Sequence, residues 1–440
     1  MEDAIALAQA LDLHSDLSAA LNAYELERKP VVEIFQHAAQ ESQVYFEELQ
    51  RYLGLDPMTF AFQLLTRSGR ITYDDLRVRD GRFGDAVDRA WTQKGRDYLQ
   101  QNSQGTFSYA AHSPLLTPLK VRSLLLTNRV TLMPSSSQLA QCGIPSEEYA
   151  SQLLKSASGG AGLLLTELVA ISDTGRITPT SPGMYNSEHM TAWASIVESL
   201  HKHSTTKVAL QLSHAGRRGS TRPRNEGLDR PLRKDNWPLL SASPLPYTPY
   251  SQQPKEMGRE EMDVICNEFV RATLLSQEAS IDLLVLNFAH GYLLASFLSP
   301  LTNLRHDEYG GDPIRRLRYP LEVFDAVRAA WSQEKPLAVA LTAIDYTKGG
   351  SDIDDAIIIA NILKEHGCDL LVVQAGQTVH ESEAPYRRGF LTSLSDQLRN
   401  RVGLPTLIGG YLTTSNEVNT LIAAGRADLC ILDPPHLSIL

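Results

Sequence analysis

Residues 282–300 read DLLVLNFAHGYLLASFLSP, and this stretch decides the fold class. After its first residue the run DLLVLNF is almost entirely apolar rather than alternating, which is typical of a parallel strand covered on both faces. Polar residues follow at the point where such a strand would end. The stretch therefore predicts a buried strand that carries polar side chains to one edge of a sheet.

Seven further runs have the same character, and each is followed by a polar loop and a helical stretch. They are RVTLM (129–133), GLLLTELVA (162–170), KVALQL (207–212), PLAVALTA (336–343), CDLLVVQA (368–375), PTLIGG (405–410) and DLCILD (428–433). Eight such strands predict an α/β fold, a TIM (β/α)₈ barrel, with an open doubly wound sheet as the alternative. The GxGxxG that a Rossmann sheet carries after its first strand is absent, which favours the barrel. Only residues 434–440 follow the eighth run, so we expect a barrel that lacks a full last helix.

Residues 1–100 lack strand-like alternation and show helical spacing instead. Ala4, Leu7, Ala8 and Leu11 predict one apolar helix face, and Pro30 is expected to begin a helix because its missing N–H costs little there. Residues 101–114 lose the pattern and are predicted to form a linker. The organisation expected for the 440 residues is therefore a helical segment (1–100), the linker and a barrel (115–440), since one core rarely serves a chain of this length.

Composition excludes several function classes. A formal charge of −10 and a pI near 5.7 argue against nucleic acid as a partner. The four cysteines form no CxxC motif, which predicts reduced thiols and no metal site. The N-terminus does not resemble a signal peptide, and no apolar run reaches the ~18 residues of a membrane span. We therefore expect a soluble, cytoplasmic protein with no membrane partner, while homo-oligomerisation is left open.

The predicted end of the third barrel strand is polar, with the sequence QLSHAGRRGS. Gln211 can both donate to and accept from an amide-like ring edge, and His214, Arg217 and Arg218 follow it. These residues are candidates for cofactor and substrate binding, because chemistry in such barrels lies where strands end. A solvated basic loop is an equally good interpretation of the spacing alone.

The end of the fourth strand carries the strongest catalytic signal. The Asn287 amide and the His290 imidazole can both donate to one carbonyl oxygen and polarise it. The Tyr292 phenol can supply a proton to the neighbouring carbon. A buried structural histidine and a core tyrosine are the alternative, but three such groups within six residues favour catalysis.

These stretches resemble the old yellow enzyme family of NADH:flavin oxidoreductases. The matching segments are LLTPLKVRSLLLTNRVTLMP (115–134), SGGAGLLLTELVAISDTGRITP (158–179), QLSHAGRRGST (211–221), AHGYLLASFLSPLTNLRHDEYGG (289–311) and AAGRADLCIL (423–432). The likeness is greatest to the bifunctional salicylyl-CoA 5-hydroxylase and 2-aminobenzoyl-CoA monooxygenase/reductase type. MEDAIALAQAL (1–11) and FAFQLLTRSGRITYDDLRVRD (60–80) are similar to the C-terminal end of a flavin hydroxylase domain, without its FAD-binding glycines. The resemblance thus implies FMN and NAD(P)H as cofactors and no FAD in this chain.

The family's cofactor roles transfer position by position. The positions that would contact FMN are Pro134, Ser135 and Ser136 after the first strand, Leu168, Gln211, and the glycines Gly409, Gly410 and Gly425. Two charge anchors are missing, because Ala340 stands where the family has an arginine, and Asp433-Pro434 replaces the Gly-Arg phosphate clamp. A lost charge-assisted contact is worth on the order of 1.5–3 kcal/mol, so the resemblance implies weakened FMN binding.

The implied substrate site contains Asn287, His290, His214, Arg217 and Gln138, with Tyr292 as proton donor. The resemblance implies an ene-reductase acting on an activated carbonyl compound or an aromatic acyl-CoA-derived enone. The arginine-rich segment 217–234 could meet CoA phosphates or simply pair with the protein's own carboxylates. A catalytically inactive barrel that binds acyl-CoA or a partner remains the alternative function. A lyase or aldolase is disfavoured, because no strand end carries a Schiff-base lysine.

Overall fold

The computed structural model describes residues 1–100, 112–134 and 139–432. The chain forms two compact units, Met1–Val87 and Asp88–Leu440, so the boundary lies near residue 87 rather than at the expected residue 100. It lies inside one continuous helix, α5 (Gly81–Gln100). No described helix is long and apolar enough to cross a membrane.

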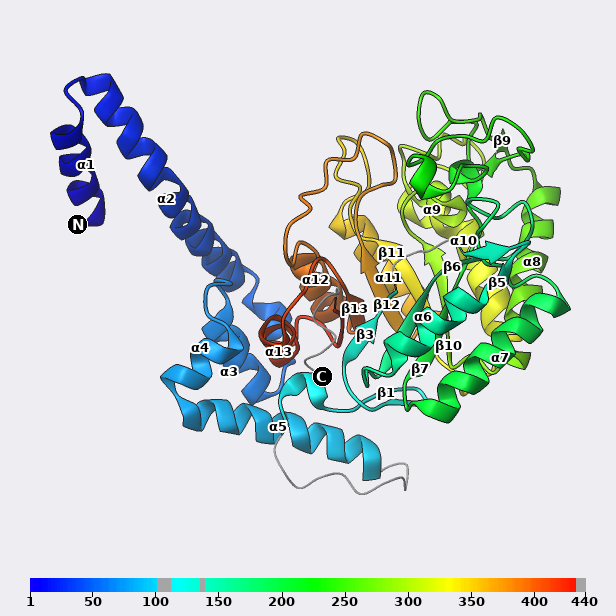
Figure 1. Cartoon of the computed structure of the whole chain (residues 1–440), viewed down its shortest axis with the longest axis horizontal. Helices are drawn as coiled ribbons and strands as arrows, with labels where there is room; N and C mark the ends of the chain where they lie inside the picture. The colour runs from blue at the N-terminus through cyan, green and yellow to red at the C-terminus, as the bar shows by residue number, and fades with distance from the viewer. Residues whose placement is uncertain (101–111, 135–138, 433–440) are drawn as a thin grey trace. The chain divides into compact units, whose positions relative to one another are not determined.

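The first unit is helical, as the sequence predicts. Its elements are α1 (Glu2–Leu13), α2 (Leu17–Glu47), the 3₁₀ turn η1 (Leu49–Tyr52), α3 (Pro57–Thr66), α4 (Tyr73–Arg79) and the start of α5. Helix α1 folds back along α2, where Arg28 pairs with Glu2 and Asp3 (Figure 1). Tyr45 and Tyr52 stack in the interior, with ring centroids 4.8 Å apart.

Two details of this unit were predicted wrongly. The buried face of α1 contains Ala6 and Ala10, whereas Ala4, Ala8 and Leu11 are exposed. Small side chains at 6 and 10 permit the close approach of α2, and periodicity alone does not reveal which face is covered. Pro30 lies inside α2 rather than at its start. The turn around it is exposed, so water can satisfy the carbonyl whose helical partner the proline removes.

The second unit is the expected barrel. Its parallel strands close in the order β10-β11-β12-β13-β14-β3-β6-β7. The strands are β3 (Val130–Leu132), β6 (Leu163–Ala170), β7 (Lys207–Ser213), β10 (Leu283–Phe288), β11 (Leu337–Thr342), β12 (Leu370–Gln374), β13 (Thr406–Ile408) and β14 (Leu429–Ile431). All eight predicted runs are confirmed as barrel strands. The last predicted element, the segment without a full closing helix, lies outside the described residues.

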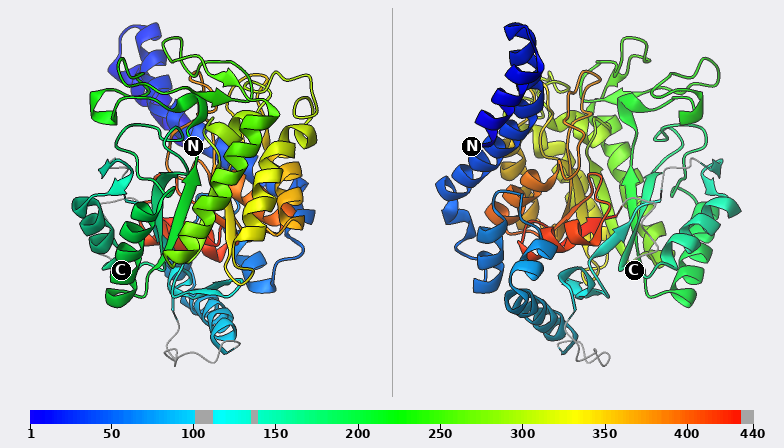
Figure 2. Two further views of the ribbon diagram at one scale, coloured as in Figure 1. Left: turned by 90° about the vertical axis from the view of Figure 1, so that its right-hand side faces the viewer. Right: turned by 60° about the vertical axis from the view of Figure 1, so that its left-hand side comes forward.

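Helices surround the strands and connect each one to the next (Figure 2). They are α6 (Glu147–Ala157), α7 (Ser187–His203), α8 (Arg259–Glu278), α9 (Leu293–Leu298), α10 (Pro313–Ala330), α11 (Ile353–Glu365), α12 (Thr392–Val402) and α13 (Ser415–Ala423). The turn η2 (Pro114–Leu116) and three short strand pairs complete the unit. Two pairs are antiparallel hairpins, β1 (Leu119–Val121) with β2 (Leu124–Leu126) and β4 (Ala140–Gln141) with β5 (Ile144–Pro145), and the third, β8 (Leu240–Ser241) with β9 (Lys255–Glu256), is parallel. Two 3₁₀ turns, η3 (Gly216–Arg218) and η4 (Arg224–Glu226), lie between β7 and β8.

One end of the barrel is apolar and sealed. Leucines and valines of the β1–β2 hairpin join the inward-facing strand residues in one buried cluster, against which Tyr98 of α5 packs. Arg129 is buried here and donates to the Thr117 hydroxyl at 3.0 Å and to the carbonyls of Asp428 and Pro118. Its guanidinium lies 4.8 Å from the centre of the Trp91 ring. Because this end, where the strands begin, is closed, the open chemistry lies at the other end.

Candidate active site

The polar residues of the barrel interior gather where the strands end. Side chains alternate along a strand, and the apolar interior cluster contains Ala209, Val285, Ala338 and Val372. The same alternation points a layer of polar side chains inward at the carboxyl ends of β7, β10, β11 and β12. This layer consists of Gln211, Ser213, Asn287, Thr342 and Gln374.

Two of the predicted flavin-contacting residues are neighbours. Leu168 of β6 is the direct partner of Gln211 in β7, after a register shift between Leu165 and Leu168. Thr166 lies in that irregularity, and its carbonyl accepts a hydrogen bond from the Gln211 side-chain amide. This bond orients the amide and leaves its oxygen to accept from a ring N–H. The bulge is what brings Leu168 level with Gln211.

Asn287 is held at the end of β10 by its neighbours. It is 3% exposed, its Nδ2 donates to Ser213 Oγ at 3.1 Å, and its Oδ1 accepts from the backbone of Ala289 at 3.2 Å. One amide hydrogen therefore remains for a further acceptor. Asn287 lies beside Ala340 of the next strand, which is buried within the apolar interior.

His290 follows in a left-handed backbone conformation, with φ of 58°. Its N–H donates to Thr342 Oγ1 at 3.0 Å, and its carbonyl accepts from Arg218 Nη1 at 2.7 Å. Desolvation, together with Arg218 and Arg224, lowers the pKa of His290 to about 3. The imidazole is therefore neutral at pH 7.

Gly291 explains how this turn fits. A Cβ at Gly291 would lie 2.4 Å from the carbonyl oxygen of Thr378, so only glycine permits the approach of the loop after β12. Its φ of 68° makes a side chain unfavourable for a second reason. Tyr292 follows, buried, at the start of α9.

Arg218 connects these elements. Its guanidinium lies 4.1 Å from the ring centre of Tyr247 and 4.9 Å from that of Tyr292. It also pairs with Asp229, with oxygens at 3.1 and 3.3 Å. The arginine is 5% exposed, so it positions Tyr292 and the His290 carbonyl from within the protein.

Arg217 is in a different position from the one predicted. Its guanidinium donates to the carbonyls of Thr378 at 2.7 Å, Leu245 at 3.2 Å and Pro246 at 3.4 Å. Burial lowers its pKa to about 10. With these bonds to the backbone of two loops, Arg217 joins loops at the barrel mouth instead of presenting its charge to a substrate.

His214 carries an unsatisfied group. Its Nδ1 accepts from the backbone of Gly216 at 3.0 Å, which places the ring proton on Nε2. That nitrogen is buried and has no hydrogen-bond partner among the described residues. Burial lowers the pKa of His214 to about 4, so the ring is neutral.

The three glycines that were expected to contact the FMN phosphate lie at opposite ends of the barrel. Gly409 and Gly410 follow β13 at the open end, and the Gly410 carbonyl accepts from Gly389 at 2.8 Å. Gly425 precedes β14, at the sealed end, and its own N–H donates to Ile422. The prediction for Gly425 is wrong, because a turn between a helix and the next strand lies opposite the site.

Pro134 follows β3 at the open end and is half-buried, whereas Ser135, Ser136 and Gln138 lie outside the described residues. Sequence reasoning missed Thr342, Gln374 and Arg388. The first two end apolar runs, which is the signal that could have found them. Arg388 gives no such signal; it lies next to Gly389, which bonds to Gly410, and it donates to Thr413 Oγ1 at 2.6 Å.

FMN is the cofactor that these features imply. The oriented amide of Gln211, beside Leu168, suits the polar edge of a flavin ring. The turn at Gly409 and Gly410 suits a phosphate. Ala340, which is 2% exposed, supplies no cation. The ring-edge groups therefore fit FMN, and one charge anchor is absent. No cluster that could hold a metal ion occurs in the described residues.

Comparisons with known proteins agree with this geometry. The model of the NADH:flavin oxidoreductase / NADH oxidase family matches residues 114–437. An NADPH dehydrogenase of Bacillus subtilis (strain 168) is 32% identical over 320 residues, covering 72% of this chain and 89% of its own. The structure of morphinone reductase in complex with tetrahydroNAD is 25% identical, with a TM-score of 0.59, covering 72% of this chain and 86% of its own.

A 2-naphthoyl-CoA reductase structure, 21% identical with a TM-score of 0.65, shares the fold; this chain spans half of its length. The family model and the relatives cover the barrel with its polar open end. The chain belongs to the NADH:flavin oxidoreductase family, the old yellow enzyme family, and is by this relationship a flavin-dependent NAD(P)H oxidoreductase.

Proposed function

We propose that this barrel reduces a carbon–carbon double bond activated by a carbonyl group, in an aromatic acyl-CoA-derived enone. The observation that carries the proposal is the convergence of Asn287, His290 and Tyr292 at one strand end, beside Arg218. When bound, FMN would accept a hydride from NAD(P)H and deliver it to the substrate's β-carbon. Gln211, Leu168, Pro134, Ser135 and Ser136 would hold the ring, with Gly409 and Gly410 at the phosphate.

The remaining catalytic roles belong to residues of the chain itself. Asn287 and neutral His290 each donate a hydrogen bond to the substrate carbonyl, which stabilises the negative charge that develops on its oxygen. Tyr292 gives its phenolic proton to the α-carbon. The low pKa of His290 supports this division, because a neutral imidazole is a poor proton source. His214 and Gln138 would line the substrate.

We propose further that FMN is held weakly. Ala340 is enclosed by the apolar interior, so no cation of β11 balances charge at the ring. Arg388, beside the Gly410 turn, is the residue we assign to the phosphate in place of the family's clamp at Asp433-Pro434. Its side chain is 63% exposed and forms an ion pair with Glu417 at 3.4 Å. Both features agree with a small contribution of Arg388 to FMN affinity.

The test is FMN titration followed by turnover. We expect protein purified without added flavin to be nearly colourless, to become yellow with FMN, and to lose the colour on dialysis. The FMN-loaded protein should then oxidise NADPH faster in the presence of a cyclic enone or an enoyl-CoA. Retention of stoichiometric FMN after dialysis would contradict the weakened site.

A barrel that binds ligands without turnover is the second candidate, and Ala340 is the observation that favours it. NADPH oxidation by the FMN-loaded protein no faster than by free FMN would establish this alternative over the ene-reductase.

For residues 1–100 we propose descent from the C-terminal end of a flavin hydroxylase. The similarity of residues 60–80 supports this, together with a core of its own around Tyr45, Tyr52 and Phe62. We propose in addition that this remnant binds no FAD, because the glycine motif is absent, and FAD binding by this chain would contradict that. Equilibrium dialysis with FAD and FMN in parallel distinguishes the two flavins.

A further inference from the structure

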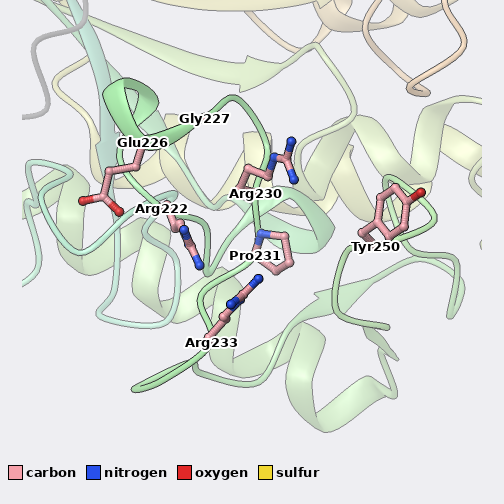
Figure 3. Close-up of a pocket in the computed structure, with 7 residues that line it drawn as sticks. All are labelled: Arg222, Glu226, Gly227, Arg230, Pro231, Arg233 and Tyr250. Atoms are coloured by element: carbon pink, nitrogen blue, oxygen red, sulfur yellow. The ribbon is translucent and has the colours of Figure 1, made fainter.

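The loop between β7 and β8 contains a pocket that the proposed chemistry does not use. Residues 220–232 form a narrow turn: Leu232 donates to Ser220 at 2.8 Å, Arg222 to the Arg230 carbonyl at 2.8 Å, and Thr221 pairs with Pro231. A pocket of about 330 Å³ lies against this turn. Its lining residues are Arg222, Glu226, Gly227, Arg230, Pro231, Arg233 and Tyr250 (Figure 3).

The charges of this pocket are unbalanced. Arg222, Arg230 and Arg233 form no ion pair or side-chain hydrogen bond with any described residue, and Glu226 is the one carboxylate in the lining. Arg222 and Arg230 stand opposite each other across the turn, an arrangement in which like charges destabilise the backbone pairing. In Figure 3, Arg222 and Arg233 approach each other beside Pro231. An anion between these guanidinium groups would remove the repulsion.

The volume of the pocket and the exposed Tyr250 indicate which kind of ligand bears the anionic group. A volume of about 330 Å³ is in the range of small-molecule sites and exceeds the need of an inorganic ion. Tyr250 is 84% exposed, so its ring is available for stacking on a planar base. Arginine pairs bidentately with phosphate oxygens, which makes three arginines a strong phosphate site.

We propose that this pocket binds the ribose phosphomonoester of an adenosine nucleotide, with the adenine against Tyr250. Two ligands of this protein class carry such a group: NADPH as a 2′-phosphate, and coenzyme A as a 3′-phosphate. The assignment of either ligand to turnover rests on the proposed function, but the binding itself does not.

The pocket is linked to the candidate active site through the ion pair between Asp229 and the buried Arg218. Asp229, which lies in the same turn, holds Arg218, and Arg218 donates to the His290 carbonyl. Arg224 of this turn also acts on His290, contributing to the lowering of its pKa. The turn that lines the pocket is therefore linked through Arg218 to the proposed catalytic strand end.

The test uses the full chain and measures binding directly. Adenosine 3′,5′-bisphosphate and adenosine 2′,5′-bisphosphate are titrated calorimetrically into the wild type, Arg230→Gln, Arg222→Gln and Lys234→Gln. Lys234 is exposed in the same loop and does not line the pocket, so it is a matched loss of charge. We expect each arginine variant to bind roughly tenfold more weakly and the lysine variant to change less than twofold.

Tighter binding of the 3′,5′ isomer assigns the pocket to coenzyme A, and tighter binding of the 2′,5′ isomer assigns it to NADPH. Equal binding of the two isomers supports a subsite that accepts either ligand. Absence of binding, or equal losses in Arg230→Gln and Lys234→Gln, overturns the proposal. Because the titration requires neither FMN nor turnover, failure of the proposed reductase activity leaves this result interpretable, and the converse also holds.

Discussion

Arg218 Nη1 donates to the backbone carbonyl of His290 at 2.7 Å, which joins the third strand's loop to the residue that ends the fourth. His290 needs this support because its positive φ is unfavourable for a residue with a side chain. The same guanidinium faces Tyr292, so one buried cation positions two of the three proposed catalytic residues.

Replacing Arg218 by Met should therefore destabilise the fold and impair turnover together. The change removes the bonds to the His290 carbonyl and to Asp229, whose side chain is 18% exposed, and we expect a loss of about 2–4 kcal/mol. Urea denaturation measures the stability, and steady-state kinetics at saturating FMN measures turnover. Arg218→Lys keeps the charge and should recover part of the stability. Full stability in Arg218→Met would contradict the positioning role.

Tyr292→Phe should slow substrate reduction by about 10²–10⁴-fold, the usual contribution of a positioned proton donor. Reduction of FMN by NADPH should be unaffected, because no proton from Tyr292 enters that step. Stopped-flow absorption separates the two half-reactions. Tyr247→Phe is the matched control, since burial raises the pKa of Tyr247 to about 12 and that phenol has no assigned role. A slow FMN reduction in Tyr292→Phe would argue against the assignment.

Stability should fall as the pH is lowered from about 6.5 toward 4. The pKa values of His214 and His290 are lowered to about 4 and about 3, so in this window the unfolded chain binds protons that the folded chain does not. Each histidine should then contribute a loss of about 1.4 kcal/mol per pH unit. Urea unfolding at pH 7, 6 and 5 gives the slope. Gln in place of either histidine should reduce it, and unchanged slopes in both variants would show that these rings are solvated.

Arg388→Gln should weaken FMN binding by roughly tenfold, the value of one charge-assisted phosphate contact. Quenching of FMN fluorescence on titration measures the Kd. Arg401→Gln removes a comparable exposed arginine that pairs with Asp354 and should leave the Kd unchanged. Equal Kd values in the two variants would contradict the placement of the FMN phosphate at the Gly410 turn.

Asp345→Asn should lower stability by about 1–3 kcal/mol and raise the KM for the carbonyl substrate. The buried carboxylate accepts from Ser299 Oγ at 2.6 Å, from Ser351 N–H at 2.7 Å and from the Thr378 hydroxyl. An amide has one acceptor oxygen, so at least one of these donors loses its partner. Asp354→Asn, at an exposed carboxylate, is the control for thermal unfolding. An unchanged KM in Asp345→Asn would show that this carboxylate does not affect substrate binding.

Much of the site could be predicted because its signals are local. The apolar run of β10 ends at Asn287, His290 and Tyr292, and strand ends in a barrel share one face whatever the details. Leu168 and Gln211 were predicted to contact one ring, and the structure places them opposite each other on neighbouring strands. The bulge that aligns them could not be predicted from the sequence. The misplacement of Gly425 came from treating a turn before a strand like a turn after one.

By itself the sequence predicted the eight strands, the barrel and the family, because apolar runs and short motifs depend on neighbouring residues. Only the tertiary structure decided which buried charges have partners. Arg217 donates to three backbone carbonyls and Arg218 to His290, while three nearby arginines have none among the described residues. These arginines look alike along the chain. They differ because closing the barrel brings carbonyls and Asp229 to the first two, and desolvation makes such pairing obligatory only where water is excluded.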